Sequence, residues 1–167
     1  MSPPPSTTTA RTIARLWRAV VPALLLAACA GTPTQAPDAT AQSDRQTVAE
    51  RAAAVAVRQV GVPYRYGGTS AADGFDCSGL VYYSYANAGK AVPRTTGGLW
   101  QELRPVPADD LQVGDVLFFD IEGKASHVGL YLGRDRFVHA PASGREVTIG
   151  SLDVGFYREA FIRGGRP

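Results

Sequence analysis

The chain has 167 residues, a length that suits one compact domain better than two. Hydrophobic residues make up 45% of it and charged residues 19%, and this composition excludes a wholly disordered chain. The formal net charge is +2, but three of the 17 basic residues lie within the first 18 positions, and the other 14 are balanced by 15 acidic residues. Because no basic excess remains to neutralise phosphates, we expect no nucleic-acid partner.

The first 28 residues have the layout of an export signal. Three arginines precede an apolar run over residues 19–28, which is shorter than the about 20 residues that a membrane helix needs. The segment Leu26-Ala27-Ala28-Cys29 resembles the cleavage box of bacterial lipoproteins. The resemblance implies that residues 1–28 are removed and that Cys29 becomes the lipid-carrying N-terminus. The alternative is an ordinary secretory leader that leaves Cys29 as a free thiol.

The segment after the leader predicts a tether. Residues 29–46 are rich in Thr, Pro, Ala and Gln and show no apolar periodicity, so we expect them to be flexible. Acyl chains on Cys29 would hold the chain on a membrane, since each buried methylene contributes about 0.8 kcal/mol. Ala30, rather than Asp, follows the cysteine, and similarity to Gram-negative lipoproteins then implies the periplasmic face of the outer membrane. We expect no disulfide between Cys29 and Cys77.

Two helices are expected at the start of a single folded domain over residues 47–167. Thr47 and Glu50 have the spacing of a capping box, and apolar residues follow at helical spacing until Gly61. A turn-rich loop follows. Asp76 suits the N-cap of a second helix over residues 77–88, which places Cys77 in its first turn.

After Pro93 the pattern changes from helical spacing to short strand-like runs. Strands are expected at residues 115–119, 127–132, 136–140, 146–149 and 159–163. Helices come first and strands later, with no βαβ alternation. The sequence therefore predicts an α+β fold in which N-terminal helices pack on a central antiparallel sheet of about five strands.

Cys77 is the candidate nucleophile, because the positive end of a helix dipole and free backbone N–H groups favour a thiolate there. The chain offers two histidines as a base, His127 and His139, on neighbouring strands of a predicted hairpin that turns around residues 133–135. A simple two-residue turn would put the two rings on opposite faces. A bulge or an odd loop length would put them on one face, where His127 could act as base and His139 could orient it.

Six segments resemble, in the same order, the motifs of NlpC-type cell-wall peptidases. They are Tyr64-Arg-Tyr-Gly-Gly, Phe75-Asp-Cys-Ser-Gly-Leu80, Pro93-Arg-Thr-Thr96, Leu111-Gln-Val-Gly-Asp-Val-Leu-Phe-Phe119, His127-Val-Gly-Leu-Tyr-Leu-Gly133 and Phe137-Val-His-Ala140. The resemblance covers about residues 47–163. It implies a papain-like fold. It also implies an enzyme that hydrolyses peptide bonds in peptidoglycan stems or cross-links through an acyl-enzyme, with no cofactor.

The same resemblance implies roles for single residues. It makes Cys77 the nucleophile, His127 the base and His139 the orienting residue. The hydroxyl of Tyr64 and the backbone N–H of Cys77 or Ser78 are then expected to bind the oxyanion. Stem peptides carry carboxylates and an amine, so the nearby charged residues are candidate substrate contacts, with plain solvation as the alternative: Arg65, Asp73 and Arg94.

Other interpretations of these residues stay open. Cys77 could be an inert buried thiol, and His139 could be a structural histidine. A zinc site of Cys77, His127 and His139 is a rival, although we expect no metal because no two of these ligands are closely spaced. The chain could also be a catalytically silent wall-binding or scaffold lipoprotein on the same fold. We expect a monomer.

Overall fold

The computed structural model describes residues 46–121 and 123–167. The predictions for the leader, for Cys29 and for nearly all of the tether lie outside these residues. The first described helix, α2, spans Val48–Val57. Its N-cap is the predicted capping box, since Thr47 Oγ1 accepts from the Glu50 N–H at 3.1 Å and Glu50 Oε2 accepts from the Thr47 N–H at 2.7 Å. No helix in this part of the chain is long and apolar enough to cross a membrane.

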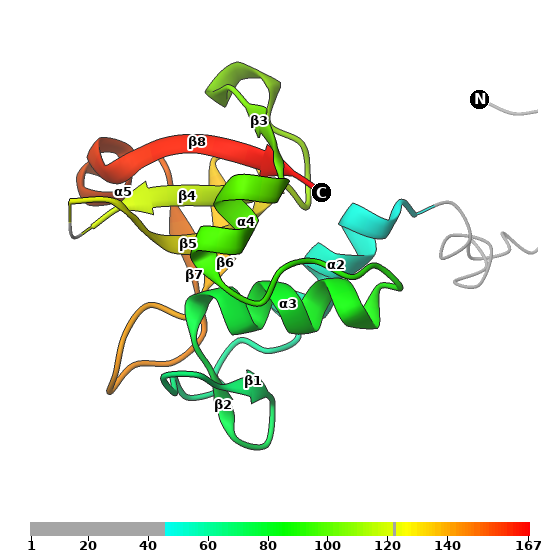
Figure 1. Ribbon diagram of the computed structural model, residues 1–167. Helices are drawn as coiled ribbons and strands as arrows, with labels where there is room; N and C mark the ends of the chain where they lie inside the picture. The colour runs from blue at the N-terminus through cyan, green and yellow to red at the C-terminus, as the bar shows by residue number, and fades with distance from the viewer. Residues whose placement is uncertain (1–45, 122) are drawn as a thin grey trace, which may run out of the picture. The chain divides into compact units, whose positions relative to one another are not determined.

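The second predicted helix is α3, which spans Cys77–Asn87 and begins after the Asp76 N-cap. Figure 1 shows α2 and α3 side by side below the main sheet, with a small hairpin near the start of α3. This hairpin consists of β1 (Thr69–Ser70) and β2 (Gly74–Phe75). A third helix, α4 (Thr96–Glu102), lies where the sequence indicated only a short segment.

The main sheet has six strands in the order β3-β8-β4-β5-β6-β7, and every neighbouring pair is antiparallel. The strands are β3 (Arg104–Val106), β4 (Val116–Asp120), β5 (Ala125–Gly133), β6 (Arg136–His139), β7 (Thr148–Ser151) and β8 (Phe161–Arg166). The α+β prediction is confirmed. The sequence analysis expected about five strands because it missed β3, a three-residue strand that contains a proline. It also missed α5 (Gly155–Ala160), the helix that leads into β8.

The two faces of the sheet bury different clusters. The face toward α2 and α3 buries the larger one, which includes Phe118, Val128 and Leu130 from β4 and β5. The opposite face buries Leu117, Phe119, Tyr131 and Phe137, which α5 and the start of β8 cover. Side chains alternate along a strand, so His127 and His139 belong to this second face, together with Tyr131 and Phe137.

The β5–β6 hairpin decides how the two histidines meet. Its turn has two residues, Arg134 and Asp135, which both adopt positive φ (53° and 55°), and Gly133 pairs with Arg136. A register shift follows between Tyr131 and Gly133, so that Tyr131 pairs with Phe137. This bulge shifts by one residue the register of all β5–β6 pairs that lie farther from the turn. It is the reason that both histidines share a face despite a two-residue turn.

Candidate active site

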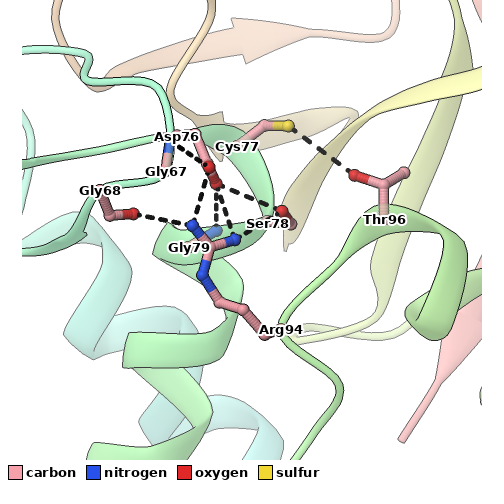
Figure 2. A network of polar contacts seen from close by, with 8 residues as sticks. All are labelled: Gly67, Gly68, Asp76, Cys77, Ser78, Gly79, Arg94 and Thr96. Atoms are coloured by element: carbon pink, nitrogen blue, oxygen red, sulfur yellow. Dashed lines mark hydrogen bonds and ion pairs between the residues drawn. The ribbon is translucent and has the colours of Figure 1, made fainter.

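The thiol of Cys77 lies in the first turn of α3, and its residue lines a groove. Asp76 caps the helix, because its Oδ1 accepts from the Gly79 N–H at 2.6 Å. The Cys77 side chain is half-buried, and hydrogen bonding by the backbone N–H groups of Val128 and Ser78 lowers the pKa of its thiol. The sulfur also lies 4.0 Å from Thr96 Oγ1 at the start of α4 (Figure 2).

Arg94 holds the turn that carries the thiol. Figure 2 shows its guanidinium between Gly68, Asp76 and Ser78. One terminal nitrogen donates to Asp76 Oδ1 at 3.0 Å and to Ser78 Oγ at 2.9 Å. The other donates to Asp76 Oδ2 at 2.8 Å and to the Gly68 carbonyl at 3.3 Å. Four donors are thus engaged inside the protein, and Arg94 supports the helix cap.

The sequence analysis offered Arg94, Arg65 and Asp73 as contacts to substrate, a role that stays a prediction; of the three, Arg94 lines the groove that holds Cys77. Both terminal nitrogens of Arg94 already have protein partners. Arg65 and Asp73 form a surface ion pair of 3.4 Å with side chains 62% and 66% exposed. Neither lines the groove that holds Cys77.

The two imidazoles form a hydrogen-bonded pair in the sheet. His127 Nε2 lies 2.8 Å from His139 Nδ1, and the rings are nearly perpendicular at 80°. His127 is 6% exposed and His139 is 1% exposed. This bond uses Nε2 of His127 and leaves Nδ1 as its second titrating nitrogen. The hydrogen bond that the hairpin spacing made possible is therefore present.

A further polar residue, which the sequence analysis missed, extends this series of hydrogen bonds. The Tyr157 hydroxyl lies 3.4 Å from His139 Nε2, on the side away from His127. Tyr157 comes from α5, a six-residue helix whose pattern was too short to predict from periodicity. A tyrosine shortly before the last expected strand was the available signal in the sequence.

Cys77 and His127 line one groove of about 700 Å³. Its wall also includes Tyr64 and Ser78, together with residues from the β6–β7 loop such as Pro141. Tyr64 is half-buried, and its backbone N–H donates to the Arg145 carbonyl at 2.8 Å. The groove therefore gathers the predicted nucleophile, base and oxyanion-binding residues, while His139 supports it from within the sheet.

Burial favours the uncharged forms of the thiol and of both imidazoles. It raises the pKa of Cys77, and the neighbouring Asp76 carboxylate acts in the same direction. Burial lowers the pKa of His127 to about 4 and that of His139 to about 3. Desolvation thus opposes the thiolate that the helix N-terminus was expected to favour, while the backbone N–H groups of Val128 and Ser78 favour it. Burial therefore favours a resting pair of a thiol and a neutral imidazole.

The charge on Asp76 follows a different balance. Burial alone raises the pKa of this carboxyl. The hydrogen bond and charge of Arg94, together with the backbone N–H groups of Gly79 and Gly67, lower the pKa by more than burial raises it. The net pKa lies below 3.8. Asp76 is therefore an ionised cap at neutral pH.

Residues 46–121 and 123–167 hold no group of three or more His, Cys, Asp or Glu side chains that could hold a metal ion.

The similarity to known proteins falls on this same region. The profile of the NlpC/P60 family matches residues 61–166. The chain belongs to the NlpC/P60 family. Its α+β architecture is thus the papain-like fold of NlpC/P60 proteins, as the sequence motifs implied.

Several curated relatives carry an NlpC/P60 segment of this kind. The chain is 39% identical over 111 residues to the murein DD-endopeptidase MepH of Escherichia coli, an alignment that covers 64% of this chain and 41% of MepH. It is 37% identical over 114 residues to the bifunctional muramidase/DL-endopeptidase CwlT of Bacillus subtilis, covering 66% of this chain and 34% of CwlT. The chain thus spans less than half the length of these relatives.

Solved structures of NlpC/P60 proteins have the same fold. One from Bacillus cereus superposes with a TM-score of 0.65 at 34% identity and covers 71% of this chain and 39% of that one. The NlpC/P60 domain of the peptidoglycan hydrolase SagA superposes with a TM-score of 0.62 at 28% identity, covering 71% of this chain and 98% of that domain.

Proposed function

We propose that the protein is a cysteine-type peptidoglycan endopeptidase, which hydrolyses peptide bonds of stem peptides or of their cross-links. The observation that carries the proposal is a single groove shared by the Cys77 thiol and by His127, whose far nitrogen is hydrogen bonded to His139. Relatives named as murein DD-endopeptidase and DL-endopeptidase support the substrate class.

The first half of the reaction forms an acyl-enzyme. His127 Nδ1 accepts the Cys77 proton as the sulfur attacks the peptide carbonyl, so charge develops only when substrate is bound. The oxyanion is stabilised by the backbone N–H of Cys77 or Ser78 and by the Tyr64 hydroxyl. The carbon–nitrogen bond then breaks, and the proton held by His127 goes to the leaving amine.

The second half releases the acyl group. His127, neutral again, takes a proton from a water molecule that attacks the thioester carbonyl. The carbon–sulfur bond breaks, and the proton returns to the sulfur of Cys77. Throughout both halves His139 accepts from His127 Nε2–H, which keeps the ring in place and spreads the transient positive charge.

Digestion of purified peptidoglycan tests this proposal. We expect soluble muropeptides from the wild-type chain and none from the Cys77→Ala variant, with an unchanged circular dichroism spectrum in the variant. Product masses identify the severed bond, either γ-D-glutamyl-diaminopimelate or the diaminopimelate–D-alanine cross-link. Equal digestion by the variant would remove Cys77 as nucleophile. Binding of the wall without cleavage by the wild type would favour the scaffold alternative.

We also propose that the chain is a lipoprotein on the periplasmic face of the outer membrane, anchored through Cys29. The support is the Leu26-Ala27-Ala28-Cys29 segment and the Ala30 that follows it. Cells fed with labelled palmitate are expected to label the wild-type chain and not the Cys29→Ser variant. Label in the inner-membrane fraction alone would contradict the sorting, and absence of label would favour the ordinary secretory leader.

A further inference from the structure

Tyr157 ends a row of hydrogen-bonded side chains that runs from His127 through His139. Its ring packs at centroid distances of 5.0 Å from Phe137, 5.5 Å from Phe119 and 5.1 Å from the His139 imidazole. This packing on three rings aims the hydroxyl at His139 Nε2, 3.4 Å away. The contact lies on the sheet face that buries Phe119 and Phe137, and Tyr157 comes to it from α5.

The direction of the hydrogen bonds in this row is fixed by what the reaction needs. His127 can accept the thiol proton only if its Nδ1 is bare, so the ring hydrogen must be on Nε2. That hydrogen is donated to His139 Nδ1 at 2.8 Å, which forces the His139 hydrogen onto Nε2. His139 is 1% exposed, so this N–H needs a protein acceptor, and the Tyr157 oxygen is in reach.

The opposite direction would stop the reaction. If the Tyr157 O–H donated to His139 Nε2, His139 would donate from Nδ1 to His127 Nε2. His127 would then carry its hydrogen on Nδ1, the nitrogen that has to take the proton from Cys77. Tyr157 is half-buried, so its own O–H is able to donate to solvent while its oxygen accepts from His139.

We propose that Tyr157 is a positioning residue for the thiol reaction, whose hydroxyl oxygen accepts from His139 Nε2–H and so keeps His127 in the tautomer with a bare Nδ1. This inference rests on the proposed function. Burial raises the pKa of Tyr157, so the hydroxyl stays uncharged at neutral pH, although Arg145 of the β6–β7 loop acts the other way. The charge of the same arginine also lowers the pKa of His139.

The variant Tyr157→Phe removes only the oxygen and keeps the ring contacts. Without that acceptor the reactive tautomer leaves the His139 Nε2–H buried and without a hydrogen bond. The two tautomers of the histidine pair therefore become closer in free energy. We expect kcat to fall about tenfold with KM unchanged within about twofold. The matched control is Tyr131→Phe, which removes a hydroxyl on the same sheet face that instead accepts from the Asp135 N–H at 3.3 Å. It should leave kcat unchanged.

Imidazole ¹⁵N spectra of the full-length chain test the inference without any activity. The chain has two histidines, so the assignment needs only a His139→Gln reference. We expect wild-type His139 to carry its hydrogen on Nε2 and the Tyr157→Phe variant to show a mixture of tautomers. A wild-type hydrogen on His139 Nδ1, or an unchanged tautomer and kcat in the variant, would overturn the inference. If the wild type shows the expected tautomer but cleaves no peptidoglycan, the proposed function fails instead.

Discussion

His127 and His139 are hydrogen bonded at 2.8 Å although they are not direct partners across the β5–β6 ladder. The register that pairs Leu130 with Val138 puts His139 opposite Gly129, two residues along β5 from His127. The two rings therefore meet diagonally over a residue without a side chain. A Cβ atom at position 129 would lie 3.3 Å from the His139 Cβ and 2.8 Å from Phe137 Cδ2.

Gly129→Ala is expected to separate the two imidazoles. The added methyl overlaps the Phe137 ring, which is fully buried and has little room to move, so we expect a loss of about 1–3 kcal/mol in the free energy of unfolding. A displaced His139 should also lower kcat by about 10²-fold, since small misplacements of a catalytic group cost rates of this order.

Urea unfolding and peptidoglycan digestion measure both effects. The control is Gly97→Ala in α4, where an added Cβ meets no atom within 4 Å and alanine favours the helix. This control should unfold at the same or a higher urea concentration. Full activity in Gly129→Ala would show that the diagonal contact is not needed.

The stability of the domain is expected to fall between pH 7 and pH 5. Burial lowers the pKa of His127 to about 4 and of His139 to about 3, from an unfolded value of 6.5. Below pH 6.5 the unfolded chain therefore binds protons that the folded chain refuses, and the stabilisation present above pH 6.5 is lost as pH falls toward 4. For both histidines together the loss between pH 7 and pH 5 is roughly 2–4 kcal/mol.

Urea titrations at pH 7 and pH 5 measure this loss, and NMR titration of the ring C–H signals locates its source. Both rings should stay neutral down to pH 5. Protonation of the Asp76 carboxyl affects stability only below pH 5, because the Arg94 guanidinium and the backbone N–H groups that bond it lower its pKa from the ordinary value. His139→Gln should reduce the pH dependence by about one proton. Histidine signals that titrate near pH 6.5 in the folded protein would contradict the expectation.

The helix starts were predictable from the sequence because their causes are local. Thr47 with Glu50, and Asp76 before Cys77, cap helices through residues three positions apart or fewer. The short elements β3 and α5 were missed because they depend on distant partners: Val106 pairs with Gly164, and Tyr157 packs on Phe137. A three-residue strand or a six-residue helix has too few residues to show a period.

The site was predictable only to the level of residue types. The sequence selected Cys77, His127 and His139, but whether the two rings share a face depended on a bulge near Leu132, which has no reliable signal. The role of Arg94 was hidden for a similar reason. Its partner Asp76 is 18 residues earlier, and a basic residue near a predicted groove suggested a ligand more readily than a partly buried ion pair.

Arg94→Gln is expected to destabilise the cap that carries Cys77. The substitution leaves the Asp76 carboxylate, which is 12% exposed, without its charged partner, and we expect a loss of about 2–4 kcal/mol in the free energy of unfolding. The control is Arg65→Gln, whose ion pair with Asp73 is exposed and is worth at most about 0.5 kcal/mol. Equal effects of the two substitutions on the urea midpoint would contradict the supporting role of Arg94.

The pH dependence of Cys77 alkylation is expected to show a neutral resting pair. Burial raises the pKa of the thiol and lowers that of His127, so we expect both groups to be uncharged in the free protein at pH 7. The rate of reaction with iodoacetamide, followed by mass spectrometry of the peptide that contains Cys77, should rise continuously up to pH 9. His127→Gln should leave the shape of this curve unchanged. An ion pair between thiolate and imidazolium would instead give a plateau between pH 5 and pH 8 that disappears in His127→Gln, and such a plateau would contradict proton transfer at the moment of attack.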